Sequence, residues 1–107
     1  MTYSCPTLGT QIELTEERRA HVEVRHPEIA IMGWQYVEDT LLSPDRIIID
    51  SHYPSTCLVI KWFDNLMSGK HVVVVVVRDQ LPMTRSWIVT AYVSSESPIG
   101  EILWPLP

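Results

Sequence analysis

The chain has 107 residues, of which 46% are hydrophobic and 20% are charged, a composition typical of a single globular domain and unlike that of a disordered segment. Thirteen acidic and eight basic side chains give a formal net charge of −5, which argues against the extended basic surface that holds duplex DNA. A small cationic pocket is compatible with this charge, because a site responds to its local field. The longest apolar run, Val72 to Val77, is too short to cross a membrane.

The beginning of the chain and the cysteines bear on compartment and cofactor. Met1 to Pro6 lacks the basic start and the apolar stretch of a secretory signal peptide, so we expect a cytoplasmic protein. Cys5 and Cys57 are too few for a disulfide framework, and we expect both thiols to be reduced. Neither cysteine stands in a CxxC pattern, and His21 and His26 lack the spacing of a zinc-binding helix. We therefore expect no metal ion and no other cofactor.

The N-terminal segment, residues 1–14, is predicted to be irregular. Pro6 and Gly9 interrupt any regular hydrophobic period there. The stretch from Gln11 to Leu14 alternates polar and apolar side chains and is compatible with one short strand. The regular core of the domain is expected to begin after this segment.

Two helices are predicted next. Thr15 is a good N-cap, and the two glutamates that follow it suit the positive end of a helix. This first helix should run to about Arg25, because the residue before Pro27 avoids the helical region. Apolar residues at helical spacing predict a second helix from about Glu28 to Leu42. Gly33 leaves open a separate first turn.

From Arg46 onward the sequence predicts strands separated by turn residues. The predicted strands are Arg46–Asp50, Cys57–Phe63, His71–Arg78 and Ser86–Ser94, with a short edge strand at Gly100–Trp104. Short connections favour antiparallel neighbours, and the valine run is apolar at both parities, which indicates a central strand. We expect one α+β domain over residues 1–107, with its core over residues 15–104. Two N-terminal helices should pack on one face of a four- to five-stranded antiparallel meander.

One face of the first predicted helix carries an unusual set of side chains. Arg18, His21 and Arg25 recur at helical spacing, so two guanidinium groups flank an imidazole. This stripe is one candidate for a functional site. The alternative is a solvated charged face on which Glu17 and Glu23 pair with the arginines.

The strands offer a smaller number of polar candidates. Lys61 interrupts an apolar strand, where it either reaches water along the sheet or points at an anion. In the last long strand, alternation places Thr90 and Tyr92 on one face and Trp87, Val89 and Ala91 on the other. The face that carries Thr90 and Tyr92 is therefore a candidate for a functional surface.

Short motifs follow one another in a fixed order through residues 15–104. They are Glu17–Glu28 (ERRAHVEVRHPE), Glu38–Asp45 (EDTLLSPD), Val59–Trp62 (VIKW), the valine strand, Trp87–Tyr92 (WIVTAY) and Gly100–Trp104 (GEILW). Together they resemble the small phage-barnase-like proteins of the barnase–EndoU–colicin–RelE ribonuclease superfamily. The order of helices and strands predicted above agrees with the fold of that superfamily.

The resemblance implies metal-independent RNA cleavage, in which the 2′-hydroxyl attacks the adjacent phosphate and leaves a cyclic 2′,3′-phosphate. This reaction needs a base, an acid and cations near the developing charge. By resemblance, the predicted catalytic residues are His21 or His26, Arg25, Lys61, Thr90 and Tyr92, and the predicted substrate-binding residues are Arg18 and Lys61. These groups are expected to converge on one face of the sheet, where Arg25 and Lys61 form a small positive patch.

Three functions remain open from the sequence. The first is an endoribonuclease, as a toxin or phage-derived effector, whose partners are RNA and an antitoxin or immunity protein, with no DNA or membrane expected. The second is a noncatalytic protein-interaction module on the same fold, favoured by the net charge and the apolar stretch Ile102–Leu106. The third is a small-molecule-binding domain lined by tryptophans, although core packing explains tryptophan more simply.

Overall fold

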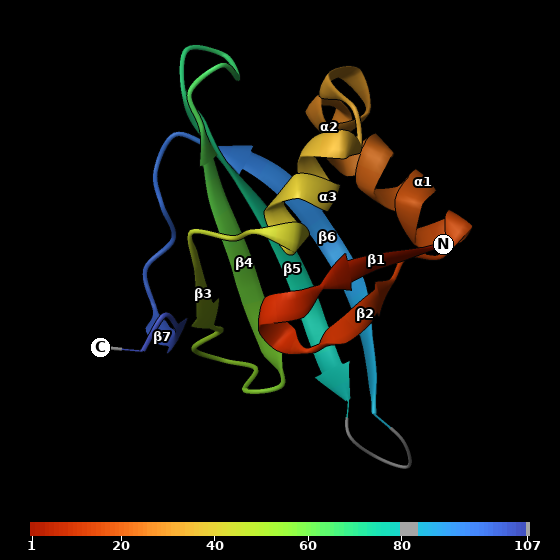
Figure 1. Ribbon diagram of the computed structural model, residues 1–107. Coiled ribbons are helices and arrows are strands. Elements are labelled where there is room, and N and C mark those ends of the chain that lie inside the picture. The colour runs from red at the N-terminus through yellow and green to blue at the C-terminus, as the bar shows by residue number, and fades with distance from the viewer. Residues whose placement is uncertain (80–83, 107) are drawn as a thin grey trace.

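The computed structural model describes residues 1–79 and 84–106, which form three helices and a seven-stranded sheet (Figure 1). The strands are β1 (Thr2–Cys5), β2 (Thr10–Glu13), β3 (Arg46–Ile49), β4 (Thr56–Phe63), β5 (Lys70–Asp79), β6 (Arg85–Ser94) and β7 (Glu101–Trp104). The helices are α1 (Glu16–Arg25), α2 (Pro27–Met32) and α3 (Gln35–Leu42), and one 3₁₀ turn is η1 (Pro6–Leu8). None of the helices in the described ranges has the length and apolar character needed to span a membrane.

The sheet has the order β1-β2-β6-β5-β4-β3-β7. Strands β3 to β6 form the predicted antiparallel meander, and β7 adds the predicted edge strand beside β3. The α+β class is therefore confirmed. The expectation of four or five antiparallel strands is wrong, because an N-terminal hairpin adds two more strands and β2 pairs with β6 in parallel.

The N-terminal segment is regular, contrary to the expectation of an irregular residues 1–14. Strands β1 and β2 pair antiparallel from Thr2↔Glu13 to Cys5↔Thr10. Pro6 begins η1, and the Gly9 N–H donates to the Pro6 carbonyl at 3.0 Å with Gly9 at φ +72°. The two residues that disrupt periodicity therefore build the turn of a hairpin, since proline fixes φ and glycine accepts a left-handed backbone.

The helices follow the predicted caps, and the predicted second helix is divided. Oγ1 of Thr15 accepts a hydrogen bond from the Arg18 N–H at 3.1 Å, which confirms the N-cap of α1. Gly33, at φ +98° and ψ +145°, ends α2 and separates it from α3. Glycine alone adopts such a backbone without strain, so the single helix expected over residues 28–42 becomes two.

The two faces of the sheet bury different clusters. On the face covered by the helices, here the helix face, the core includes Val72, Val74 and Val76 of the central strand. On the opposite side, here the back face, a smaller cluster is built on Ile48, Ile60 and Val73, with three partly buried neighbours. Figure 1 shows α3 in front of the central strands and the β1–β2 hairpin on the same side. The prediction that the valine strand is central and covered on both faces is confirmed.

The connection between β6 and β7 contacts the back face. Arg46, which pairs with Ile60 and so shares its face, donates through Nη2 to Oγ of Ser97 and to the carbonyl of Pro98. Gly100 approaches the side chain of Ile48 closely enough that a Cβ there would lie 3.1 Å from Cδ1. The connection thus helps to bury the apolar cluster of this face.

The buried cysteine Cys57 gives a test of the core. Burial raises the pKa of its thiol to about 11, and electrostatic repulsion from Cys5 contributes in the same direction. Cys5 is also a buried free thiol. Because the folded protein holds the proton of Cys57 more tightly than the unfolded chain, the stabilisation is fully present below about pH 9 and is lost as the pH rises toward 11. We expect urea unfolding to show a loss of about 2–3 kcal/mol over that interval, beyond the loss in Cys57→Ala. Equal pH slopes for the two proteins would contradict this assignment.

Candidate functional site

Helix α1 runs beside β6, and the chain path explains why. Strand β2 pairs with β6 in parallel at Glu13↔Trp87, and α1 begins three residues after Glu13, so it continues along β6. At the far end of α1, the ring of His26 lies 5.8 Å from that of Tyr92, measured between centroids. Figure 1 shows α1 next to the upper part of β6. We call this line of contact the α1–β6 seam.

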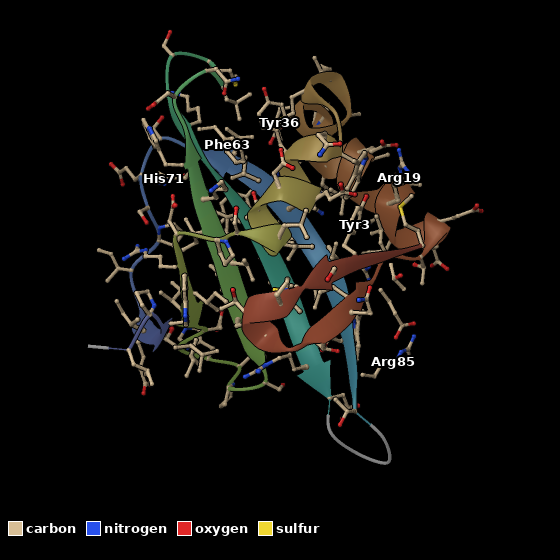
Figure 2. All side chains as sticks on the ribbon, in the orientation of Figure 1. Tyr3, Arg19, Tyr36, Phe63, His71 and Arg85 are labelled. Atoms are coloured by element: carbon tan, nitrogen blue, oxygen red, sulfur yellow. The ribbon has the colours of Figure 1, made fainter. Side chains whose placement is uncertain are left out.

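A groove of about 460 Å³ opens at the N-terminal end of the seam. We call it the α1–β6 groove; its lining residues are Glu13, Thr15, Glu17, Arg18, His21, Arg85, Trp87 and Ile88. Figure 2 shows Arg85 at the lower end of β6, below α1. The groove brings together two of the predicted site residues, Arg18 and His21, with charged groups from β2 and β6.

The best-defined contact in the groove joins Glu13 to Arg85. Nε of Arg85 donates to Oε2 of Glu13 at 2.8 Å, and Nη2 donates to Oε1 at 3.4 Å. The hydrogen bond from Arg85 lowers the pKa of the Glu13 carboxyl, so the carboxylate is ionised at neutral pH. The guanidinium of Arg85 also lies 5.2 Å from the centroid of the Trp87 ring. Carboxylate, guanidinium and indole therefore form one connected set.

The arginine and histidine that α1 contributes to the groove are not held by acidic neighbours. Within residues 1–79 and 84–106, Arg18 and Arg25 form no ion pair. Glu23 instead pairs with Arg19 at 3.7 Å and accepts a hydrogen bond from the indole of Trp34 at 2.9 Å. The alternative in which Glu23 neutralises the stripe therefore does not describe this helix. Arg18 can bind an anion without first breaking an ion pair.

The other end of the seam holds His26, Tyr92 and Thr90. His26 caps α1 and precedes α2, so the chain bends there, and its ring lies against Tyr92 rather than in the groove. Nδ1 of His26 lies 3.4 Å from a carboxylate oxygen of Glu28. Burial raises the pKa of the Tyr92 hydroxyl, which therefore stays protonated at neutral pH. Thr90 lies between the two ends, on the same face of β6 as Tyr92.

Lys61 does not share a face with Thr90 and Tyr92, so the expected convergence of all three on one sheet face is wrong. Lys61 pairs with Val72 on the helix face, whereas Tyr92 pairs with Val73 on the back face. Nζ of Lys61 donates to the Ser43 carbonyl at 2.9 Å and lies 3.9 Å from a carboxylate oxygen of Asp45. Alternation tells which residues of one strand share a face, but only the register between strands tells which residues of two strands share it. The positive patch expected from Arg25 and Lys61 stays a prediction.

The face assigned to Trp87 is also corrected. The register along β6 shifts between Val75↔Thr90 and Val76↔Ile88, which leaves Val89 without a partner. A bulge of this kind inserts one residue and reverses the alternation beyond it. Trp87 consequently lies on the back face with Thr90, and its ring reaches the groove.

Glu13 and Arg85 are functional candidates that the sequence did not reveal. They are 72 residues apart and meet because β2 pairs with β6, a contact that no local pattern predicts. The sequence feature that could have pointed to them is that each is a charged residue at the end of a strand with an alternating pattern.

Among the described residues, no group of three or more histidine, cysteine, aspartate or glutamate side chains is arranged to hold a metal ion. Comparisons with protein families, with curated proteins and with solved structures found no significant match for this chain.

Proposed function

We propose that this chain is an endoribonuclease that cleaves single-stranded RNA without a metal ion, with the α1–β6 groove as its active site. One observation carries the proposal: His21 and Arg18 line the same groove as the Glu13–Arg85 pair and Trp87. The groove therefore combines two groups able to transfer protons with two guanidiniums and an aromatic ring. Its two arginines balance its two glutamates, in a chain whose net charge is −5. The local field therefore opposes a phosphate less than the net charge suggests.

Each group has a role that its chemistry supports. Glu13, ionised because Arg85 donates to it, accepts the proton of the ribose 2′-hydroxyl while the O2′–P bond forms. His21, in its protonated form, donates a proton to the 5′-oxygen as the P–O5′ bond breaks. The products are a cyclic 2′,3′-phosphate and a free 5′-hydroxyl. Arg18 and Arg85 stabilise the charge that accumulates on the phosphoryl oxygens.

The remainder of the seam suits the strand that enters or leaves the groove. Arg25 follows His21 by one helical turn and is exposed, while Tyr92 and His26 present two rings at the far end. Cations interleaved with aromatic rings are the usual means of holding single-stranded nucleic acid. His26 in this proposal binds substrate and does not transfer a proton.

The test is cleavage of defined RNA by the purified protein in the presence of EDTA. We expect products that end in a 2′,3′-cyclic phosphate, and no cleavage where a single 2′-deoxynucleotide replaces the nucleotide 5′ to the scissile bond. Loss of the 2′-hydroxyl removes the nucleophile but leaves the phosphate intact. Cleavage of the 2′-deoxy substrate, or failure to cleave either total or transfer RNA, would contradict the proposal.

A noncatalytic interaction module is the second candidate, and it also rests on a specific observation. Ile99 and Leu106 are 98% and 77% exposed, and Ile102 and Trp104 of the edge strand β7 are also exposed. Exposed apolar side chains near an open strand edge suit a protein partner, such as an antitoxin or immunity protein. The two candidates use different surfaces, so replacing Ile102 and Leu106 by serine should leave RNA cleavage unchanged.

A further inference from the structure

Trp62, on the back face near the end of β4, is an exposed indole held in one orientation. It is 40% exposed, yet its Nε1 donates to Oδ1 of Asp64 at 2.5 Å. Its backbone N–H donates to Oδ2 of Asp45 at 2.6 Å. Gly69 lies against the ring so closely that a Cβ there would be 2.5 Å from Cζ2 of Trp62. The rotamer freedom that such a side chain usually loses on binding has already been lost in folding.

The ring of His71 completes this arrangement. It meets the indole edge to face, with 4.8 Å between centroids and 65° between planes. Within the described part of the chain, Nδ1 of His71 is one of two buried side-chain polar atoms without a hydrogen-bond partner. An orphaned N–H is more costly than an orphaned lone pair, so the neutral ring carries its proton on Nε2. Nε2–H is then available as a donor to a ligand.

Strand register connects this pair of rings to the α1–β6 seam. His71 pairs with Trp62 on one side and with Ser94 on the other, and the next row of the back face contains Tyr92. With neighbouring strands about 4.8 Å apart and two residues about 6.6 Å long, Trp62 lies roughly 12 Å from Tyr92. That is a span of a few nucleotides. Figure 2 shows His71 at the upper left of the molecule, well apart from Arg85 at the lower right.

We propose that Trp62 and His71 form a nucleobase-binding subsite for the single-stranded RNA that leaves the α1–β6 seam at Tyr92, an inference that rests on the proposed function. A fixed, exposed indole stacks on any base, and the Nε2–H of His71 can donate to an acceptor on the base edge. The carboxylate of Asp64 accepts from the indole and that of Asp45 accepts from the backbone N–H of Trp62, so both disfavour a phosphate near this residue. The subsite therefore recognises the base and leaves the phosphates to the seam.

The experiment measures the binding of a fluorescent 2′-O-methyl hexaribonucleotide, which has no free 2′-hydroxyl and cannot be cleaved. We expect Trp62→Ala to weaken its binding by about 5- to 100-fold, since one stacked base is lost. Trp62→Phe should retain most of the affinity, because it keeps a ring for stacking. Trp104→Ala, which removes another exposed indole on β7, is the matched control and should bind within about twofold of the unmutated protein.

Substrate length separates the subsite from the groove. A 2′-O-methyl dinucleotide is too short to reach both and cannot gain affinity from the two together, so Trp62→Ala should weaken its binding less than it weakens that of the hexamer. Equal hexamer affinities of Trp62→Ala and the unmutated protein, both folded by circular dichroism, would overturn the subsite even if cleavage is established. Absence of hexamer binding by the unmutated protein would also overturn it. Hexamer binding that depends on Trp62, without any RNA cleavage, would support the subsite and overturn only the nuclease.

Discussion

His21→Ala is expected to lower the rate of RNA cleavage by about 10²- to 10⁴-fold, the range that a general acid or base contributes. In the proposed reaction His21 protonates the 5′-oxygen, and without that proton a poor leaving group must depart as an alkoxide. His21 is exposed, so its replacement should leave the fold and the melting temperature nearly unchanged. Single-turnover cleavage of a defined RNA measures the loss.

A second substrate tests whether His21 acts specifically by protonating the leaving group. A nucleoside 3′-aryl phosphate has a leaving group that departs without protonation, so His21→Ala should cleave this substrate almost as fast as the unmutated protein. His26→Ala is the matched control and should raise KM with little change in kcat, because His26 lies at the other end of the seam beside Tyr92. A large loss of kcat in His26→Ala, with normal activity in His21→Ala, would move the acid to the far end of α1.

The strands and helices of this chain were largely predictable because their signals are local. Thr15 and Pro27 mark the ends of α1, and turn residues separate the four strands of the meander. The β1–β2 hairpin was not predicted because proline and glycine interrupt the hydrophobic pattern, although here they build the turn. The parallel pairing of β2 with β6 was hidden because it joins segments separated by most of the chain.

The site was predictable only in part, for the same reason. The stripe of Arg18 and His21 follows from helical spacing, which is local, and the two residues do line one groove. The carboxylate and guanidinium that complete the groove, Glu13 and Arg85, meet only through the nonlocal strand pairing. The face of Lys61 relative to Thr90 and Tyr92 of β6 depended on strand register, which period-two patterns do not fix between strands.

Arg85→Ala is expected to lower cleavage about 10²- to 10³-fold, comparable to the loss of one preorganised donor to a developing charge. Arg85 acts twice in the proposed reaction, because it stabilises the phosphoryl oxygens and keeps the Glu13 carboxylate ionised. Arg85→Lys should recover only part of the rate, since an ammonium keeps the charge but cannot replace the two-pronged contact with Glu13. Lys61→Ala should leave the rate within a few-fold, because Lys61 is bound to Ser43 on the helix face.

The pH dependence of kcat/KM distinguishes a catalytic Arg85 from a structural one. Glu13 must be deprotonated to act as the base, and Arg85 holds the pKa of its carboxyl below the ordinary range. The activity of the unmutated protein should therefore persist to low pH, and in Arg85→Ala the acid limb of the profile should move to higher pH as the pKa of Glu13 returns to its ordinary value. A folded Arg85→Ala that keeps full activity and an unshifted acid limb would exclude the groove as the active site. Abolished cleavage in a folded Lys61→Ala would instead place the phosphate on the helix face, beside Ser43 and Asp45.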